Sequence, residues 1–235
     1  MDSDLRSHKA YCGMVDSHGF CLLELGLVHY QEALDLQLSL HSDVCEGRLS
    51  GALLLLEHFP VITLGASADP INLLVPESVL ESQGIELVRT DRGGDATYHG
   101  PGQLVGYPII NLRSIGSDVH RFLRLIESVI ISTLADFGIT GSRNGPAGVW
   151  VGAKKICSIG IAIRKGVTYH GFALNINPNM AHFAFINPCG LNAAQITSIS
   201  SLITPVPDIN TVRARLVDHF EQETGLRTRL SKAEQ

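Results

Sequence analysis

The sequence is poor in charged and aromatic side chains. Of its 235 residues, charged types make up 17% and aromatic types 6%, with a single Trp. Hydrophobic residues reach 45%, which is too apolar for a disordered chain and enough to bury a sizeable core. Although this length could hold two small domains, we predict a single catalytic domain over residues 1–235.

No apolar run is long enough to cross a bilayer. The longest, residues 51–65, is interrupted by Glu57, His58 and Pro60 and falls short of the roughly 20 apolar residues that a spanning helix needs. The first twenty residues carry three acidic side chains and no apolar segment, so they match neither a secretory signal nor an Arg-rich transit peptide. We therefore expect a cytoplasmic protein that binds no membrane.

Positive charge and paired cysteines are also scarce. The formal net charge is −5, which argues against a nucleic-acid partner held through phosphate contacts. The five cysteines are odd in number and widely scattered, and no CxxC pair occurs. We therefore expect neither disulfides nor a metal site.

Periodicity predicts an α+β fold in which helices cover a mixed, mostly antiparallel sheet. Strands are expected at 20–25, in two parts of 52–64, at 85–90, at 103–112 and in a hairpin of 155–165 and 167–176 joined by Gly166. Pro108 suggests that its strand lies at an edge or contains a bulge. Helices are expected at 29–47 (Tyr30, Ala33, Leu34, Leu38 and Leu40 inward), near 76–84, at 116–138 (Val119, Phe122, Ile126, Val129, Thr133 and Phe137 inward) and at 208–225 (Val212, Leu216 and Phe220 inward).

The segment RGGDATYHGPGQ, residues 92–103, is the first candidate for a binding site. Its spacing matches neither the P-loop nor the dinucleotide-binding loop, so a phosphate site is not indicated. Glycine lets backbone amides approach a ligand closely, but the same glycines could merely shape a tight connection. Thr-Tyr-His-Gly recurs at 168–171, and we expect both copies to face one pocket from neighbouring strands.

Cys189 is the candidate nucleophile. Flanked by Pro188 and Gly190, it belongs to a turn that a ligand can reach, although a lone cysteine is more often inert packing. A nearby cation would favour its thiolate, and the candidates are Lys155, His99 and His170. Each of these three also has an ordinary reading, as a solvated lysine or a core histidine. Cys157, within an alternating apolar run, is expected in the core.

Several motifs together resemble one family. RGGDATYHGPGQLVGYPIINL, GVW (148–150), KICSIG (155–160), YHGFALN (169–175) and INPCGL (186–191) are similar to the lipoyl(octanoyl) transferases. The resemblance spans roughly residues 50–200 and implies the fold of biotin and lipoate protein ligases. It also implies that Cys189 is the acyl-carrying nucleophile and Lys155 its proton-transfer partner. The implied acyl pocket comprises Arg92, Gly93, Gly94, Asp95, Ala96, Thr97, Tyr98, His99, Ser158, Ile159, Gly160, Gly171, Phe172 and Ala173.

The resemblance further implies a donor and acceptors. The donor would be octanoyl-acyl carrier protein, and the acceptors a lysine in lipoyl domains of 2-oxoacid dehydrogenase E2 subunits and in glycine cleavage H protein. Thioester exchange needs no ATP, so no cofactor or metal is expected. Ala66 stands where many members have an arginine, which puts one anionic contact in doubt. Because both partner types are typically acidic, a basic docking patch is expected, with Arg121, Arg124, Lys154, Arg164 and Lys165 as candidates, each of which could equally be an ordinary solvated charge.

Three alternatives stay open. An ATP-dependent lipoate or biotin ligase of the same fold would form an acyl-adenylate and would need no cysteine. An octanoyl amidotransferase would use the same cysteine chemistry but would take octanoyl from a protein amide. A non-enzymatic acyl-binding module would retain the ligand without a covalent adduct.

Overall fold

A seven-stranded mixed sheet organises the protein. The computed structural model describes residues 20–187 and 193–230. The strand order is β10-β1-β2-β6-β9-β8-β7, with β1 parallel to β10 and β2 and all other neighbours antiparallel. The strands are β1 (Phe20–Val28), β2 (Gly51–His58), β6 (Gln103–Ile110), β7 (Gly148–Val151), β8 (Lys154–Arg164), β9 (Val167–Asn175) and β10 (Thr228–Leu230).

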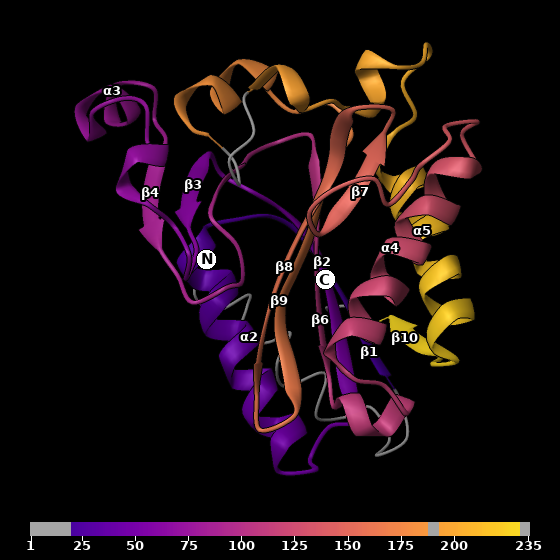
Figure 1. The fold of residues 1–235 in the computed structure, drawn as a ribbon. Helices are drawn as coiled ribbons and strands as arrows, with labels where there is room; N and C mark the ends of the chain where they lie inside the picture. The colour runs from indigo at the N-terminus through magenta and orange to yellow at the C-terminus, as the bar shows by residue number, and fades with distance from the viewer. Residues whose placement is uncertain (1–19, 188–192, 231–235) are drawn as a thin grey trace.

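Helices cover both faces of this sheet (Figure 1). Helix α2 (Tyr30–Cys45) lies on one face, and α4 (Val119–Ala135) and α5 (Ile209–Thr224) lie side by side on the other. The run Ala52 to Leu56 is apolar at every position because both of its faces are covered. Leu53 and Leu55 belong to the core under α4 and α5, whereas Ala52 and Leu54 pack with α2.

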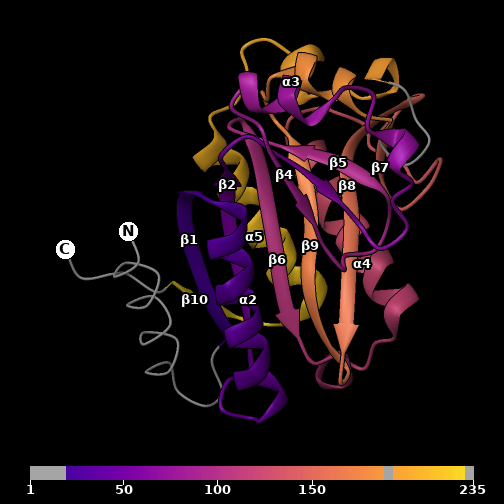
Figure 2. The ribbon, with the colours of Figure 1, turned by 90° about the vertical axis from the view of Figure 1, so that its left-hand side faces the viewer.

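A second, three-stranded sheet lies on the same side as α2 (Figure 2). Its order is β4-β3-β5, formed by β3 (Val61–Leu64), β4 (Glu86–Arg89) and β5 (Ala96–His99). It shares a core with helix α3 (Glu77–Ser82) and with two 3₁₀ helices, η3 (Met180–Phe185) and η5 (Ala193–Gln195). The remaining 3₁₀ turns are η1 (Pro70–Asn72), η2 (Leu112–Ile115) and η6 (Ile199–Ser201). Strand β5 is part of the glycine segment, residues 92–103, so the small sheet holds that segment against β8 of the large sheet.

The predicted α+β class and its mixed sheet are confirmed. Asp118 caps α4 by accepting the Arg121 N–H at 2.9 Å. Between β8 and β9, Lys165 and Gly166 have φ of 52° and 79°, the left-handed pair that a tight two-residue hairpin requires. On α5, Val212, Leu216 and Phe220 are all buried.

Some details of the prediction are wrong. Leu38 and Val119 are 43% and 41% exposed, because the buried stripe of α2 runs instead through Ala33, Leu36, Gln37, Leu40 and Val44, and that of α4 starts at Phe122. Leu34 and Phe137 are only partly buried.

Two further expectations also need correction. Pro108 lies in β6, an interior strand, at a place where the paired register with β9 has ended at Gly106. There the Thr168 hydroxyl donates to Pro108 O and accepts from Ile110 N–H. Cys21 is disulfide-bonded, contrary to the expectation of no disulfide, because scattered spacing says nothing about spatial pairing. Within residues 20–187 and 193–230, no helix is both long and apolar enough to cross a membrane.

Candidate active site

The glycine segment and the β8–β9 hairpin enclose a pocket between the two sheets. Its empty volume is about 480 Å³, a figure that includes open space at its mouth, and the part that a water-sized sphere can occupy is about 40 Å³. The lining residues are Tyr30, Arg92, Gly93, Gly94, Thr97, His99, Tyr107, Lys155, Ser158, Ile159, Gly160, His170, Gly171, Phe172 and Ala173. Most of the predicted acyl-pocket residues, together with Lys155, are therefore brought together.

The glycines are needed because two backbones touch. Gly93 N–H donates to Ile161 O at 3.1 Å. A Cβ at Gly160 would lie 2.5 Å from Gly93 O, and a Cβ at Gly93 would lie 3.0 Å from Ile161 O. No larger side chain fits at Gly160 without moving the loop, so glycine here lets the loop and strand form one continuous pocket wall.

Arg92 ties this loop to the small sheet. The side chain is buried, and its guanidinium donates to Thr63 Oγ1 (3.0 Å) and O (2.7 Å), to Gly93 O (3.1 Å) and to Asp95 O (2.6 Å). These four bonds join β3 to the two ends of the turn before β5. Arg92 thus lines the pocket while holding its shape.

The alternation of β5 explains which predicted residues miss the pocket. Thr97 and His99 line it, whereas Ala96 and Tyr98 point to the opposite side and pack in the core of the small sheet. Asp95 also lies outside the lining, where its carboxylate accepts from Asn72 Nδ2 and Ala96 N–H. Ala96, Tyr98 and Asp95 shape the wall from behind.

Lys155 is not a solvated lysine. It is 3% exposed and lies on the pocket wall, with Nζ 5.7 Å from the centroid of the Trp150 ring. A Cβ at Gly148 would lie 2.5 Å from Lys155 Cε, so the lysine stem passes where glycine leaves room. Its backbone carbonyl accepts Thr197 N–H at 2.9 Å.

Hydrogen bonds fix the tautomers of two buried histidines. His58 Nδ1–H donates to Val28 O (3.0 Å), so its bare Nε2 accepts from the Tyr107 hydroxyl (2.7 Å). Gln103 Nε2 donates to Tyr98 O, which turns Gln103 Oε1 toward His99 and requires His99 Nδ1 to be the donor (2.7 Å). Burial holds the pKa of His99 well below its usual value. His99 is therefore neutral at pH 7, with Nε2 as an acceptor.

The second Thr-Tyr-His-Gly reaches the same pocket from the other sheet. His170, in β9, lines the pocket, and its Nε2–H donates to Asp91 Oδ1 at 2.9 Å. Burial lowers the pKa of His170. The two copies therefore do share a pocket, although β5 and β9 are not neighbouring strands.

Sequence reasoning left Tyr30 and Tyr107 out of the pocket. It reached His170 only through the repeated tetrapeptide.

Acid should destabilise the protein through His58. Burial lowers its pKa to about 4, below the 6.5 of an unfolded histidine, so between these values the unfolded chain binds more protons than the folded one. The free energy of unfolding therefore falls as the pH drops, by roughly 3 kcal/mol from this one group. Urea unfolding at steps from pH 7 to pH 4 measures the loss.

The His58→Gln variant is the matched control because an amide of similar reach can donate to Val28 O without titrating in this range. Between pH 6.5 and 4, the free energy of unfolding of this variant should fall by roughly 3 kcal/mol less than that of the wild type. Equal losses in the two proteins would show that His58 is not responsible.

Cys189 lies outside the described residues. The chain on either side of it is anchored: Asn187 N–H donates to Asn72 O, and Thr197 N–H donates to Lys155 O, each at 2.9 Å. Cys157 is a core residue as predicted, and burial raises its pKa to about 12, so it is no thiolate.

The predicted basic residues do not form one patch. Lys154 and Arg164 stand at opposite ends of β8, roughly 33 Å apart at the usual rise per strand residue. Lys165 is beside Arg164 at the hairpin turn, and Arg121 and Arg124 are on α4. Ala66 is exposed, and its N–H donates to Arg92 O.

Comparison with known proteins assigns this chain to a family. The family model of the lipoyl protein ligase A/B catalytic domain matches residues 29–221. An octanoyltransferase of Alkaliphilus metalliredigens is 42% identical over 86% of this chain and 93% of its own. One of Caldicellulosiruptor saccharolyticus is 42% identical over 91% of this chain and 92% of its own. The chain belongs to the octanoyltransferase family.

Solved structures share the fold of this octanoyltransferase-family chain. A bipartite lipoate protein ligase of Thermoplasma acidophilum superimposes with a TM-score of 0.72 at 19% identity, over 92% of this chain and 88% of the other. A lipoate-protein ligase A bound with ATP gives 0.69 at 19% identity, over 91% and 89%. At this identity the likeness concerns the fold alone, and it confirms the biotin and lipoate ligase architecture.

Proposed function

We propose that this protein transfers octanoyl from acyl carrier protein to a lysine of lipoyl domains, through a thioester on Cys189, as the first step of endogenous protein lipoylation. The observation that carries the proposal is the pocket in which buried Lys155 meets the glycine segment and the β8–β9 hairpin, in a chain of the octanoyltransferase family. Acceptors would be lipoyl domains of 2-oxoacid dehydrogenase E2 subunits and glycine cleavage H protein.

The chemistry has two balanced steps. The Cys189 thiolate attacks the thioester carbonyl, the new C–S bond forms, and the bond to the phosphopantetheine sulfur breaks as that sulfur takes a proton from Lys155. The acceptor amine then attacks the Cys189 thioester, loses a proton to Lys155 and releases the Cys189 thiolate. Thioester exchange is nearly neutral and amide formation is downhill, so no ATP, metal or other cofactor is required.

The pocket suits a medium acyl chain. Ile159, Phe172 and Ala173 supply apolar wall, and the contact between Gly93 and Gly160 makes the loop and the strand one continuous surface. Neutral His99 and His170 present no fixed charge to a fatty chain. The polar end of the ligand would lie toward Lys155, one of two cationic side chains in the lining, whose stem passes Gly148.

A lipoate ligase is the rival function, because its fold is the same and one structural neighbour carries ATP. The intact mass of the protein after mixing with octanoyl-acyl carrier protein, without ATP, separates the two. We expect one octanoyl adduct on the wild type, labile to hydroxylamine, and none on Cys189→Ala.

The Cys157→Ala variant is the matched control, since that thiol is buried in the core and should leave the adduct unchanged. No adduct on the wild type, with the carrier thioester intact, would overturn the Cys189 mechanism. Lysine acylation that needs ATP and survives Cys189→Ala would favour the ligase.

A further inference from the structure

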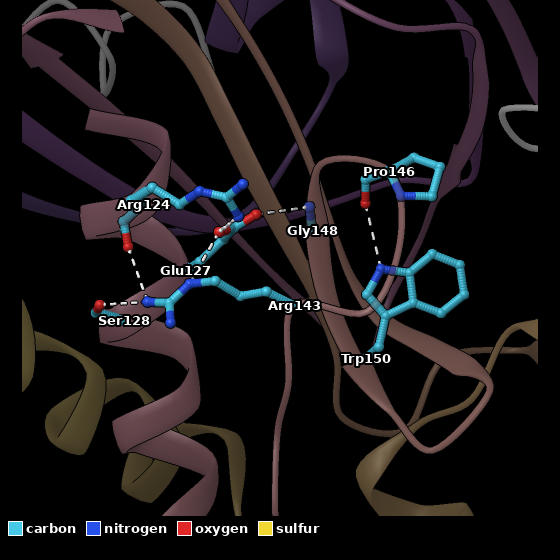
Figure 3. Close-up of polar contacts among 7 residues, drawn as sticks. All are labelled: Arg124, Glu127, Ser128, Arg143, Pro146, Gly148 and Trp150. Carbon is cyan, nitrogen blue, oxygen red and sulfur yellow. Dashed lines mark hydrogen bonds and ion pairs between the residues drawn. The ribbon is translucent and has the colours of Figure 1, made fainter. Parts of the chain in front are cut away.

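A carboxylate is buried on the side of β7 away from the pocket. Glu127 lies in the middle of α4, where its side chain is only 4% exposed. One oxygen accepts from Arg124 Nη1 (2.7 Å) and Arg143 Nε (3.0 Å), and the other faces Gly148 N–H (3.4 Å; Figure 3). A buried charge is costly unless it is paired, and here it is satisfied from three sides.

Arg143 extends this contact into a clamp. Besides Glu127, its guanidinium donates to Ser128 Oγ (2.6 Å) and Arg124 O (3.3 Å), so one side chain fixes the start of the 143–148 segment on α4 (Figure 3). The end of the segment is fixed at Gly148, whose N–H faces the other Glu127 oxygen. We call Glu127, Arg143 and Gly148 the α4 clamp.

The segment that the clamp holds also contacts Trp150. Its indole N–H donates to Pro146 O at 3.2 Å, and its backbone exchanges two bonds with Ser142, adjacent to Arg143. A Cβ at Gly145 would lie 2.6 Å from the indole ring. The ring is therefore fixed by the same segment that Glu127 and Arg143 hold.

The Lys155 side chain passes close to both Gly148 and Trp150. Its Cε is 2.5 Å from where a Gly148 Cβ would be, and its Nζ is 5.7 Å from the Trp150 centroid. We propose that Glu127 is a positioning residue: through Gly148 and Trp150, it sets the direction in which the Lys155 ammonium enters the pocket. The proposal rests on the proposed function of Lys155 and adds the device that orients it.

The test is Glu127→Gln, which keeps size but replaces one acceptor oxygen with an NH₂ that must face an arginine or Gly148 N–H. We expect kcat for octanoyl transfer to fall about 10- to 30-fold while KM for the carrier stays within about twofold, because misplacing a catalytic group costs rate more than binding. Trp150, the single Trp of the sequence, should show shifted fluorescence. Arg143→Gln, at a side chain that is 38% exposed, should lower kcat by about 3- to 10-fold and should also shift the Trp150 fluorescence.

Glu221→Gln is the matched control. On α5, its carboxylate also accepts from a guanidinium (Arg227) and a backbone N–H (Thr228), but it has no contact with the pocket lining. Its kcat and Trp150 emission should equal those of the wild type, with folding of every variant checked by urea unfolding.

Wild-type kcat in folded Glu127→Gln and Arg143→Gln, or lowered kcat with unchanged Trp150 emission, would overturn the clamp. A wild type that takes up no octanoyl would instead overturn the proposed function.

Discussion

Lys155→Met should reduce kcat/KM for octanoyl transfer by about 10³-fold, the usual scale for losing a general acid–base group. Methionine fills the same channel past Gly148, so the wall and the fold should survive while the cation is lost. On the proposed mechanism two effects combine: the Cys189 thiolate would lose its counter-charge, and the leaving sulfur would lose its proton donor. Steady-state transfer to a lipoyl domain measures the whole, and the rate of adduct formation measures the first step.

Lys154→Met is the natural control because the neighbouring lysine is exposed and outside the pocket lining. It should retain activity within about twofold, as surface substitutions usually do. Lys155→Arg keeps the charge but cannot release a proton, and its wider head meets Gly148 and Trp150, so it should fail nearly as badly as methionine. Full activity in Lys155→Met would remove Lys155 from the mechanism.

Most elements of the large sheet and its covering helices could be read from sequence because their signals are local, whereas the short strands β7 and β10 were not predicted. The run at 52–56 is apolar throughout, Gly166 marks a hairpin, and the α5 stripe repeats at helical spacing. Strands β3 and β4 were predicted, but β5, and with it the separate small sheet, was missed for a physical reason. Its central strand β3 pairs with β4 and with β5, and β5 lies inside the glycine segment, where turn residues hide strand character.

The residues of the site also divide into those that the sequence predicts and those that only the fold brings together. Motif resemblance predicted most of the lining, but only the observed strand separates Thr97 and His99, on the pocket face, from Ala96 and Tyr98 behind it. Tyr30 enters the lining from α2, far earlier in the chain, and Tyr107 enters it from β6, which directly follows the glycine segment. Glu127 resembles any charged helix residue until Arg143 and Gly148, 16 and 21 positions later, bury it. The role of Cys189 stays a prediction.

Arg92→Leu should lower the free energy of unfolding by roughly 4–6 kcal/mol, among the largest effects of any single change here. Leucine fills part of the volume but removes the guanidinium from Thr63 O and Gly93 O, while Asp95 O keeps its second donor, Gly65 N–H. Each buried acceptor without a partner costs about 1–3 kcal/mol. Urea unfolding at pH 7 measures the difference.

Arg89→Leu gives the control at the end of β4, where the arginine is exposed and should contribute within about 0.5 kcal/mol. Arg92→Lys should recover only part of the loss. The planar guanidinium reaches carbonyls in three directions, whereas the compact ammonium of lysine cannot reach all of them. A loss below about 1 kcal/mol in Arg92→Leu would mean that water replaces the guanidinium in the folded loop. Since Arg92 holds the turn that carries Gly93 onto Gly160, the stability of the protein and the width of its pocket depend on the same side chain.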